Sequence, residues 1–153
     1  MAQNSIIVQS FTKVQKEYTA TAVAITPGML VEITSAGLVQ AHSGVAANVI
    51  PMFALEDELQ GRGIATNYGV STRVQVWIPR RGDEVYALLA DGQTAVIGSF
   101  LESNGAGALQ VFVADEPSDQ QYPANIVGQA MEAVDLSDSA NLSALGRIII
   151  RIL

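Results

Sequence analysis

GRIIIRIL, at residues 146–153, is the stretch of sequence that most clearly predicts a β-fold. Successive side chains of a strand point to opposite faces, so three isoleucines share one face and a fourth lies with two arginines on the other. The first face holds Ile148, Ile150 and Ile152, and the second holds Arg147, Ile149 and Arg151. Such a strand would aggregate if its edge were exposed, so we expect it to be paired within a sheet. Its two arginines would then act as gatekeepers or reach a partner.

The segment VQVWIP, at residues 74–79, predicts a second strand by the same alternation. Its β-branched residues share one face, while Gln75 and Trp77 share the other. Pro79 ends the strand because proline has no N–H to donate to a ladder. Trp77 is either part of the core or an anchor in a contact between subunits, where tryptophan is often found.

Short strands separated by glycine and proline recur along the rest of the chain. We expect hairpins at 30–41 and 100–113, a strand at 85–90, and a strand at 126–134 in which Gly128 marks a bulge or a close backbone approach. Residues 53–59 are the one acidic stretch with helical character. We therefore predict a mainly β fold, with one compact, barrel-like or sandwich domain at residues 16–153. Residues 1–15 form either an N-terminal arm or the first strand.

The composition excludes several classes of function. Of 153 residues, 49% are hydrophobic and 15% are charged, against a usual charged fraction of about 25%, which suggests that part of the surface is covered by a partner. The net charge of −7 disfavours binding to nucleic acid or to an anionic membrane. The chain has no cysteine and a single histidine, so disulfides and multi-histidine metal sites are excluded within one chain, and we expect no cofactor. No targeting segment is visible, and we expect folding in a cytoplasm.

No set of residues points to catalysis, so we do not expect an enzyme. We expect His42 to be an exposed loop residue, and we expect the acidic runs Glu56–Glu58 and Asp83–Glu84 to lie in solvated turns. The tripeptide Arg81-Gly82-Asp83 is interpreted as a turn between two strands, not as an integrin-binding motif. A domain of this kind either binds another molecule or builds an assembly.

Several strings of residues follow one another in a familiar order. They are PGMLVEI (27–33), FALEDELQGRGI (53–64), VQVWIP (74–79), RGDEVYALLADGQ (81–93), FLESNGAGALQV (100–111) and GRIIIRIL (146–153). In this order they resemble the capsid cement, or head decoration, proteins of tailed bacteriophages. The resemblance runs from about residue 24 to the end of the chain, and its central block is fairly specific.

This resemblance implies a structural role. Proteins of the cement family have a small β-rich domain, often called a β-tulip, and assemble as homotrimers on the outer surface of the expanded phage head. They bridge neighbouring copies of the major capsid protein and help the shell resist the pressure of packaged DNA. We therefore expect a virion protein that is present in the host cytoplasm during assembly, without a cofactor. The alternatives are another β-type virion protein, of the tail tube or of head completion, and a glycan-binding module, for which the aromatic residues are few.

Seven residues are candidates for the interface with the capsid or within the trimer. Residues 5–11 form a candidate arm over a neighbouring subunit, because this segment contains apolar side chains among polar ones. The successive arginines at 80 and 81 could pair with an acidic capsid surface; the alternative is that they lie in a solvated turn. The candidates are Ile6, Ile7, Val8, Phe11, Trp77, Arg80 and Arg81.

Overall fold

The computed structural model describes residues 3–10, 14–114, 124–138 and 146–153, and these residues are mainly in strands. The elements, in chain order, are β1 (Ile7–Gln9), β2 (Gln15–Thr19), β3 (Val31–Ile33), β4 (Val39–Ala41), β5 (Phe53–Ala54), the short 3₁₀ helix η1 (Glu58–Gln60), β6 (Arg73–Trp77), β7 (Glu84–Leu89), β8 (Thr94–Ala95), β9 (Phe100–Ser103), β10 (Leu109–Val111), β11 (Ile126–Ala130), β12 (Val134–Asp135) and β13 (Gly146–Ile152).

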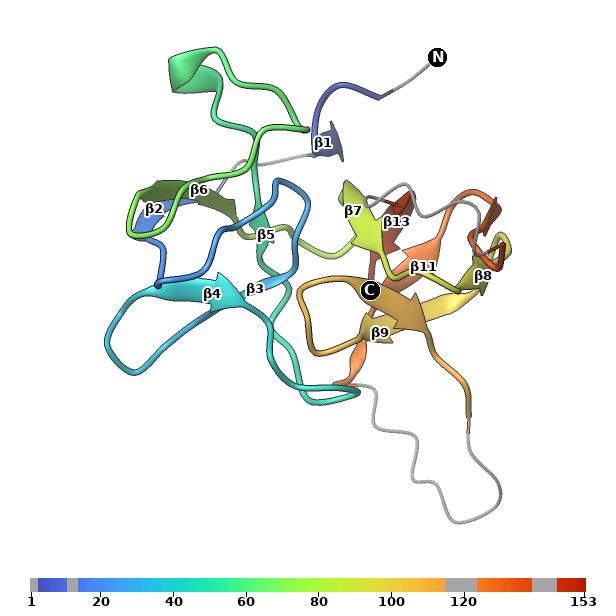
Figure 1. Ribbon diagram of the computed structural model, residues 1–153. Coiled ribbons are helices and arrows are strands. Elements are labelled where there is room, and N and C mark those ends of the chain that lie inside the picture. The colour runs from blue at the N-terminus through green and yellow to red at the C-terminus, as the bar shows by residue number, and fades with distance from the viewer. Residues whose placement is uncertain (1–2, 11–13, 115–123, 139–145) are drawn as a thin grey trace.

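Five strands close into a barrel. They follow one another as β7, β10, β9, β11 and β13, and the pairing of β13 with β7 closes the ring. That last pairing is antiparallel and runs from Gly146 opposite Leu89 to Arg151 opposite Glu84. Figure 1 shows these strands gathered on one side of the molecule, with β2, β5 and β6 on the other. The prediction of a mainly β, barrel-like single domain is therefore confirmed.

The second edge of β7 is completed by three separate segments. The N–H of Tyr86 donates to the carbonyl of Ile6 at 2.8 Å, that of Leu88 to Gly28 at 3.0 Å, and that of Ala90 to Leu109 at 2.8 Å. β1 thus lies antiparallel to the start of β7, and β10 lies parallel to its end. The barrel wall at β7 therefore depends on the N-terminal segment and on the turn at Pro27 and Gly28.

Two apolar cores lie on either side of β6. Strand β6 is the centre of a three-stranded sheet with β2 and β5. Its Trp77 belongs to the barrel core, together with the three inward isoleucines of β13, whereas Val74 and Val76 belong to a second core. The alternation predicted from VQVWIP is confirmed, and the apolar residues on both faces of the strand are buried because each face packs against a different core.

The short-range predictions hold at most positions. Strands β3 and β4 form one hairpin, and β9 and β10 form another, both antiparallel. Gly128 fulfils both of its predicted roles, because the register of β11 shifts beside it and an added Cβ would lie 2.6 Å from the carbonyl oxygen of Arg151. The helical character expected of residues 53–59 is largely wrong. Phe53 and Ala54 pair with β6, and only η1 forms a helical turn, which ends at Gly61 in the left-handed conformation.

Replacement of Ile150 by alanine tests the barrel core. Its side chain is fully buried, so Ile150→Ala should lower the free energy of unfolding by about 2–5 kcal/mol, the usual cost of such a cavity. Ile149→Ala is the matched control, because its side chain lies on the opposite, partly exposed face of the same strand. Urea denaturation of both variants measures the difference. Equal losses would contradict the placement of the two faces.

Candidate docking surface

The turn between β6 and β7 is held by a buried carboxylate. The N–H of Arg80 donates to Oδ2 of Asp83 at 2.8 Å, and the N–H of Asp83 donates back to the carbonyl of Arg80 at 3.0 Å. Gly82 adopts a φ of +94°, which glycine reaches without strain, and its N–H donates to Ile152 of β13 at 2.9 Å. The turn predicted at Arg81-Gly82-Asp83 is confirmed. An integrin-type reading is excluded, because Asp83 has no exposed surface.

The expectation of solvated acidic turns is wrong for three carboxylates. Asp83 is fully buried, and Glu56 and Asp57 are buried beside η1. For Asp83 and Glu56, the physical reason is that hydrogen bonds within the chain replace water at the carboxylate. In addition to the bond from Arg80, Asp83 lies 3.5 Å from Oγ of Ser10, and Glu56 accepts a bond from the N–H of Ile6 at 3.2 Å.

Four of the seven candidate residues come together at this end of the barrel. Arg80 and Arg81 are exposed on the turn, and Ile7 and Val8 are partly exposed on β1, which pairs with the first residues of β7. Ser10 connects the two segments through Asp83. We call this group of four residues the docking surface. Among the described residues, neither Arg80 nor Arg81 forms an ion pair.

The remaining candidates are placed differently. Ile6 and Trp77 have no exposed surface and pack in the barrel core. Of the two roles predicted for Trp77, this placement is that of a core residue and not of an anchor between subunits. A side chain without exposed surface makes no contact with a second chain in this conformation, so neither belongs to the docking surface. Phe11 lies outside the described residues. The sequence alone showed that residues 5–11 carry apolar side chains, but not which of them point inward.

Arg151 and Glu84 form an ion pair next to the docking surface. Their N–O distance is 2.8 Å, and the two residues are opposite one another in the β7–β13 ladder. This pair neutralises Arg151, the second predicted gatekeeper on the outer face of β13. Among the described residues at this end of the barrel, the exposed arginines without an ion pair are therefore the two of the turn.

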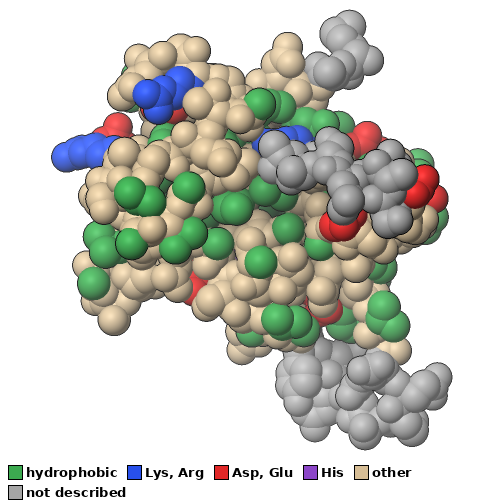
Figure 2. All heavy atoms as spheres, in the orientation of Figure 1, with side chains coloured by type: hydrophobic (Ala, Val, Ile, Leu, Met, Phe, Trp, Pro, Cys, Tyr) green, Lys and Arg blue, Asp and Glu red, His purple; other side chains and the backbone are tan. Residues whose placement is uncertain are grey.

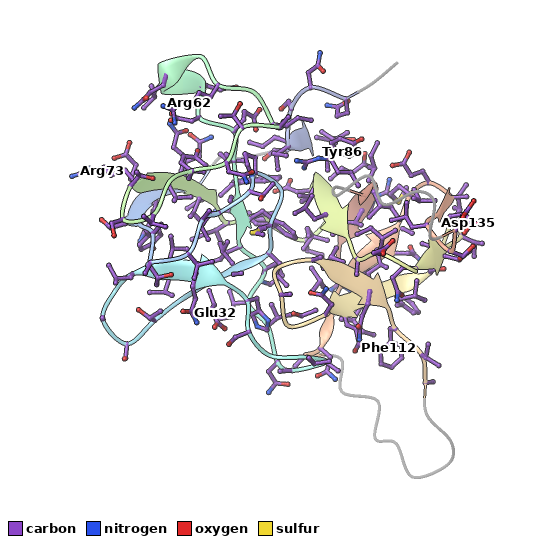
Figure 3. The ribbon with its side chains drawn as sticks, viewed as in Figure 1. Glu32, Arg62, Arg73, Tyr86, Phe112 and Asp135 are labelled. Carbon is purple, nitrogen blue, oxygen red and sulfur yellow. The ribbon has the colours of Figure 1, made fainter. Side chains whose placement is uncertain are left out.

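The expectation that His42 is an exposed loop residue is wrong. Its side chain is buried, with Nδ1 2.8 Å from Oγ of Ser103 and Nε2 3.8 Å from Oε2 of Glu32. The hydroxyl of Ser103 also accepts a bond from the N–H of Gly105 at 3.1 Å. The Ser–His–Glu order has the connectivity of a hydrolase triad. However, Ser103 has no exposed surface from which to reach a substrate. The three side chains instead join the β3–β4 hairpin, which carries Glu32, to the β9–β10 hairpin, which carries Ser103. Glu32 is labelled in Figure 3.

Glu32 provides a test of this junction. Burial raises the pKa of its carboxyl, but hydrogen bonds from Ser43 and Gln40 and the charge of His42 outweigh that effect, so the pKa lies below its ordinary value of 4.5. A carboxyl whose pKa is lower in the folded state than in the unfolded state stabilises the folded protein at a pH above the unfolded-state pKa. This stability is lost as the pH falls through the folded-state pKa. We expect the stability lost below about pH 4.5 to be smaller in Glu32→Gln. Urea denaturation at a series of acidic pH values measures it, and an unchanged pH dependence would contradict this role.

Replacement of Asp83 tests the turn that carries the docking surface. Asp83→Ala removes the acceptor of the partly buried hydrogen bond from the N–H of Arg80, and should lower the free energy of unfolding by about 1–3 kcal/mol. Arg81→Ala is the control from the same turn; its side chain is exposed, and the expected change is within about 0.5 kcal/mol. Thermal or urea denaturation measures both. A neutral Asp83→Ala variant would show that the carboxylate does not hold the turn.

Other kinds of site are not seen in the described part of the chain. No group of three or more histidine, aspartate or glutamate side chains is placed there to hold a metal ion. In the same residues, no helix is long and apolar enough to span a bilayer. The surface view in Figure 2 shows hydrophobic side chains spread across the central face, with lysine and arginine at few places.

Comparison with known proteins identifies one informative fold. No protein-family model and no curated protein matches the chain. Among solved structures, it is similar to the crystal structure of the N base of the head fiber protein gp8.5 of bacteriophage phi29. The TM-score is 0.52 at 15% sequence identity, and the match covers 92% of this chain and 95% of that chain. At this identity, the likeness shows that the two chains share a fold.

Proposed function

We propose that this chain is a structural protein of a tailed-bacteriophage virion. In this proposal it binds the outer surface of the expanded head as a homotrimer and bridges neighbouring copies of the major capsid protein, so that the shell withstands the pressure of packaged DNA. It acts without a cofactor and without contact to nucleic acid or membrane. The protein is present in the host cytoplasm until it joins the capsid.

The observation that carries the proposal is the shared fold over nearly the whole chain. The similar structure is the base of a fiber on a phage head, and the match leaves little of either chain uncovered. The order of short strings from residue 27 to residue 153 independently resembles the cement family. Both point to a component of the phage head, and the cement role is the more specific one.

The surface is suited to association with other subunits. Several large apolar side chains are at least 70% exposed, namely Ile50, Leu59, Ile97 and Val113. With few charges to keep it solvated, such a surface gains free energy when it is covered. A trimer on a shell would also contact several capsid subunits at once, so modest individual contacts would add up through avidity. No catalytic step is needed for this role.

The two exposed arginines of the docking surface are the proposed contact to an acidic patch on the shell. Charged groups at the rim of an interface mainly steer association and fix orientation. Arg81→Glu should therefore weaken binding to expanded, undecorated heads by about tenfold, a change of about 1.4 kcal/mol. Arg62→Glu is the charge-matched control, since Arg62 is also exposed but lies beyond η1.

Co-sedimentation with heads measures the binding, and light scattering measures the mass of the free protein. A mass near three times 16.1 kDa is expected for a trimer in solution. Rings of six or open polymers would indicate a tail component instead. A chain that does not sediment with heads at all would overturn the proposed function, whereas equal binding by the two variants would overturn only the role of Arg81.

A further inference from the structure

The turn between β9 and β10 contains the asparagine–glycine pair Asn104-Gly105. In such a pair, the backbone nitrogen of the glycine can attack the side-chain carbonyl carbon of the asparagine, because glycine has no Cβ to hinder the approach. Asn104 is the only asparagine of the chain that precedes a glycine. It is therefore the position at which loss of the side-chain amide is chemically easiest.

Both reacting groups are hydrogen-bonded in the folded chain. The N–H of Gly105 donates to Oγ of Ser103 at 3.1 Å. Oδ1 of Asn104 accepts the N–H of Ala106 at 2.8 Å and that of Ala108 at 3.1 Å, as in an Asx turn. The nitrogen of Gly105 must lose its proton to act as a nucleophile, and the amide of Asn104 must rotate to expose its carbon. The three bonds therefore oppose the reaction while the turn is closed.

Ser103 is itself fixed by the loop that follows β4. Its Oγ lies 2.8 Å from Nδ1 of His42, its carbonyl accepts the N–H of Ala46 at 3.0 Å, and its side chain has no exposed surface. Val45 of the same loop covers Gly105, since a Cβ added at that glycine would lie 2.6 Å from Cγ2 of Val45. The loop thus keeps the acceptor of the Gly105 N–H in place.

Solvent nevertheless reaches the asparagine. Asn104 is partly exposed, and it lines a surface hollow of about 290 Å³ together with Ala106 and Ala108. Water can enter such an opening, and ammonia can leave through it. The restraint on Asn104 therefore comes from the hydrogen bonds of the turn and not from the exclusion of water.

We propose that Asn104 is a deamidation site and that Ser103 sets its rate by holding the turn closed. When the turn opens, the nitrogen of Gly105 bonds to Cγ of Asn104 and the bond from Cγ to Nδ2 breaks. Nδ2 leaves as ammonia, with the proton that the N–H of Gly105 gives up. Water then opens the cyclic imide at one of its two carbonyls, which yields aspartate or isoaspartate.

Isoaspartate at position 104 would disturb the junction between the two hairpins. Its main chain runs through the side-chain carbons and is longer than that of asparagine by a methylene group. The bond from the N–H of Asn104 to the carbonyl of Ala108, now 3.0 Å, and the bridge of Asn104 to Val45 would both lose their register. Deamidation would therefore loosen the contact of the β9–β10 hairpin with the loop after β4.

Replacement of Ser103 by alanine tests the proposal. Ser103→Ala removes the acceptor of the Gly105 N–H, so Asn104 of the folded variant should be deamidated about tenfold faster than in the wild-type chain. Ile150→Ala is the control for a general loss of stability, because Ile150 pairs with β7 and β11 and not with the β9–β10 hairpin. The folded proteins are incubated at mildly alkaline pH, and peptide mass spectrometry measures the fraction of Asn104 that is converted.

We expect the wild-type chain and Ile150→Ala to retain Asn104 while Ser103→Ala loses it. Equal rates in the wild-type chain and in Ser103→Ala would overturn the proposal. Equal acceleration by the two variants would overturn it as well, because the reaction would then require global unfolding. In the urea-denatured wild-type chain, Asn104 should react faster than Asn67, which precedes a tyrosine. A rate at Asn104 that is no faster would contradict the assignment of the site.

If Ser103→Ala does not fold, the wild-type chain carries the test at urea concentrations that leave it folded. Local opening of the turn is measured by hydrogen exchange at the N–H of Gly105. The rate of deamidation at Asn104 should rise in parallel with this exchange. A rate that does not follow the exchange would overturn the proposal.

Discussion

Closure of the barrel by the β7–β13 ladder is the constraint on which the rest of the structure depends. The ladder joins the C-terminal strand to a strand 57 to 67 residues earlier, and it runs through six registered pairs. It points three isoleucines inward and carries the ion pair of Arg151 and Glu84 on the outside. With one edge of β7 occupied in this way, only its other edge remains for β1 and β10. The position of the docking surface at the start of β7 follows from that arrangement.

The same ladder also connects the barrel to two loops outside it. Arg147 of β13 extends its guanidinium 5.6 Å from the centre of the Tyr86 ring and donates from Nη2 to the carbonyl of Ile64 at 2.8 Å. Burial lowers the pKa of Arg147 below its ordinary value, although the charge of Glu56 acts in the opposite direction. Gly28 is needed at this point, because its φ is +89° and an added Cβ would lie 3.0 Å from the carbonyl oxygen of Tyr86. The outer residue of one strand thus fixes the loop after η1 and the turn before β3.

The strands were predictable from the sequence because alternation is a local property. The faces of β6 and β13, both hairpins and the bulge at Gly128 depend on residues within a few positions of each other. The burial of Glu56 and His42 was not predictable, because their partners are distant in the chain. Glu56 is bonded to a residue 50 positions away, and His42 to one 61 positions away. A carboxylate or an imidazole is expected to be solvated until such a partner is known. The candidate site was limited in the same way: the apolar character of residues 5–11 was evident, but the burial of Ile6 depends on the barrel it enters.

Exposed charges such as those of Arg80 and Arg81 guide the approach of a partner but contribute little to the final affinity, since water and salt screen them. Such contacts alone would not hold a protein on a capsid. In the proposed function, an oligomer would contact several shell subunits, so each weak contact would raise the effective concentration of the next. A shell with the matching geometry would then be bound firmly, while a free shell subunit that offers one contact would be released.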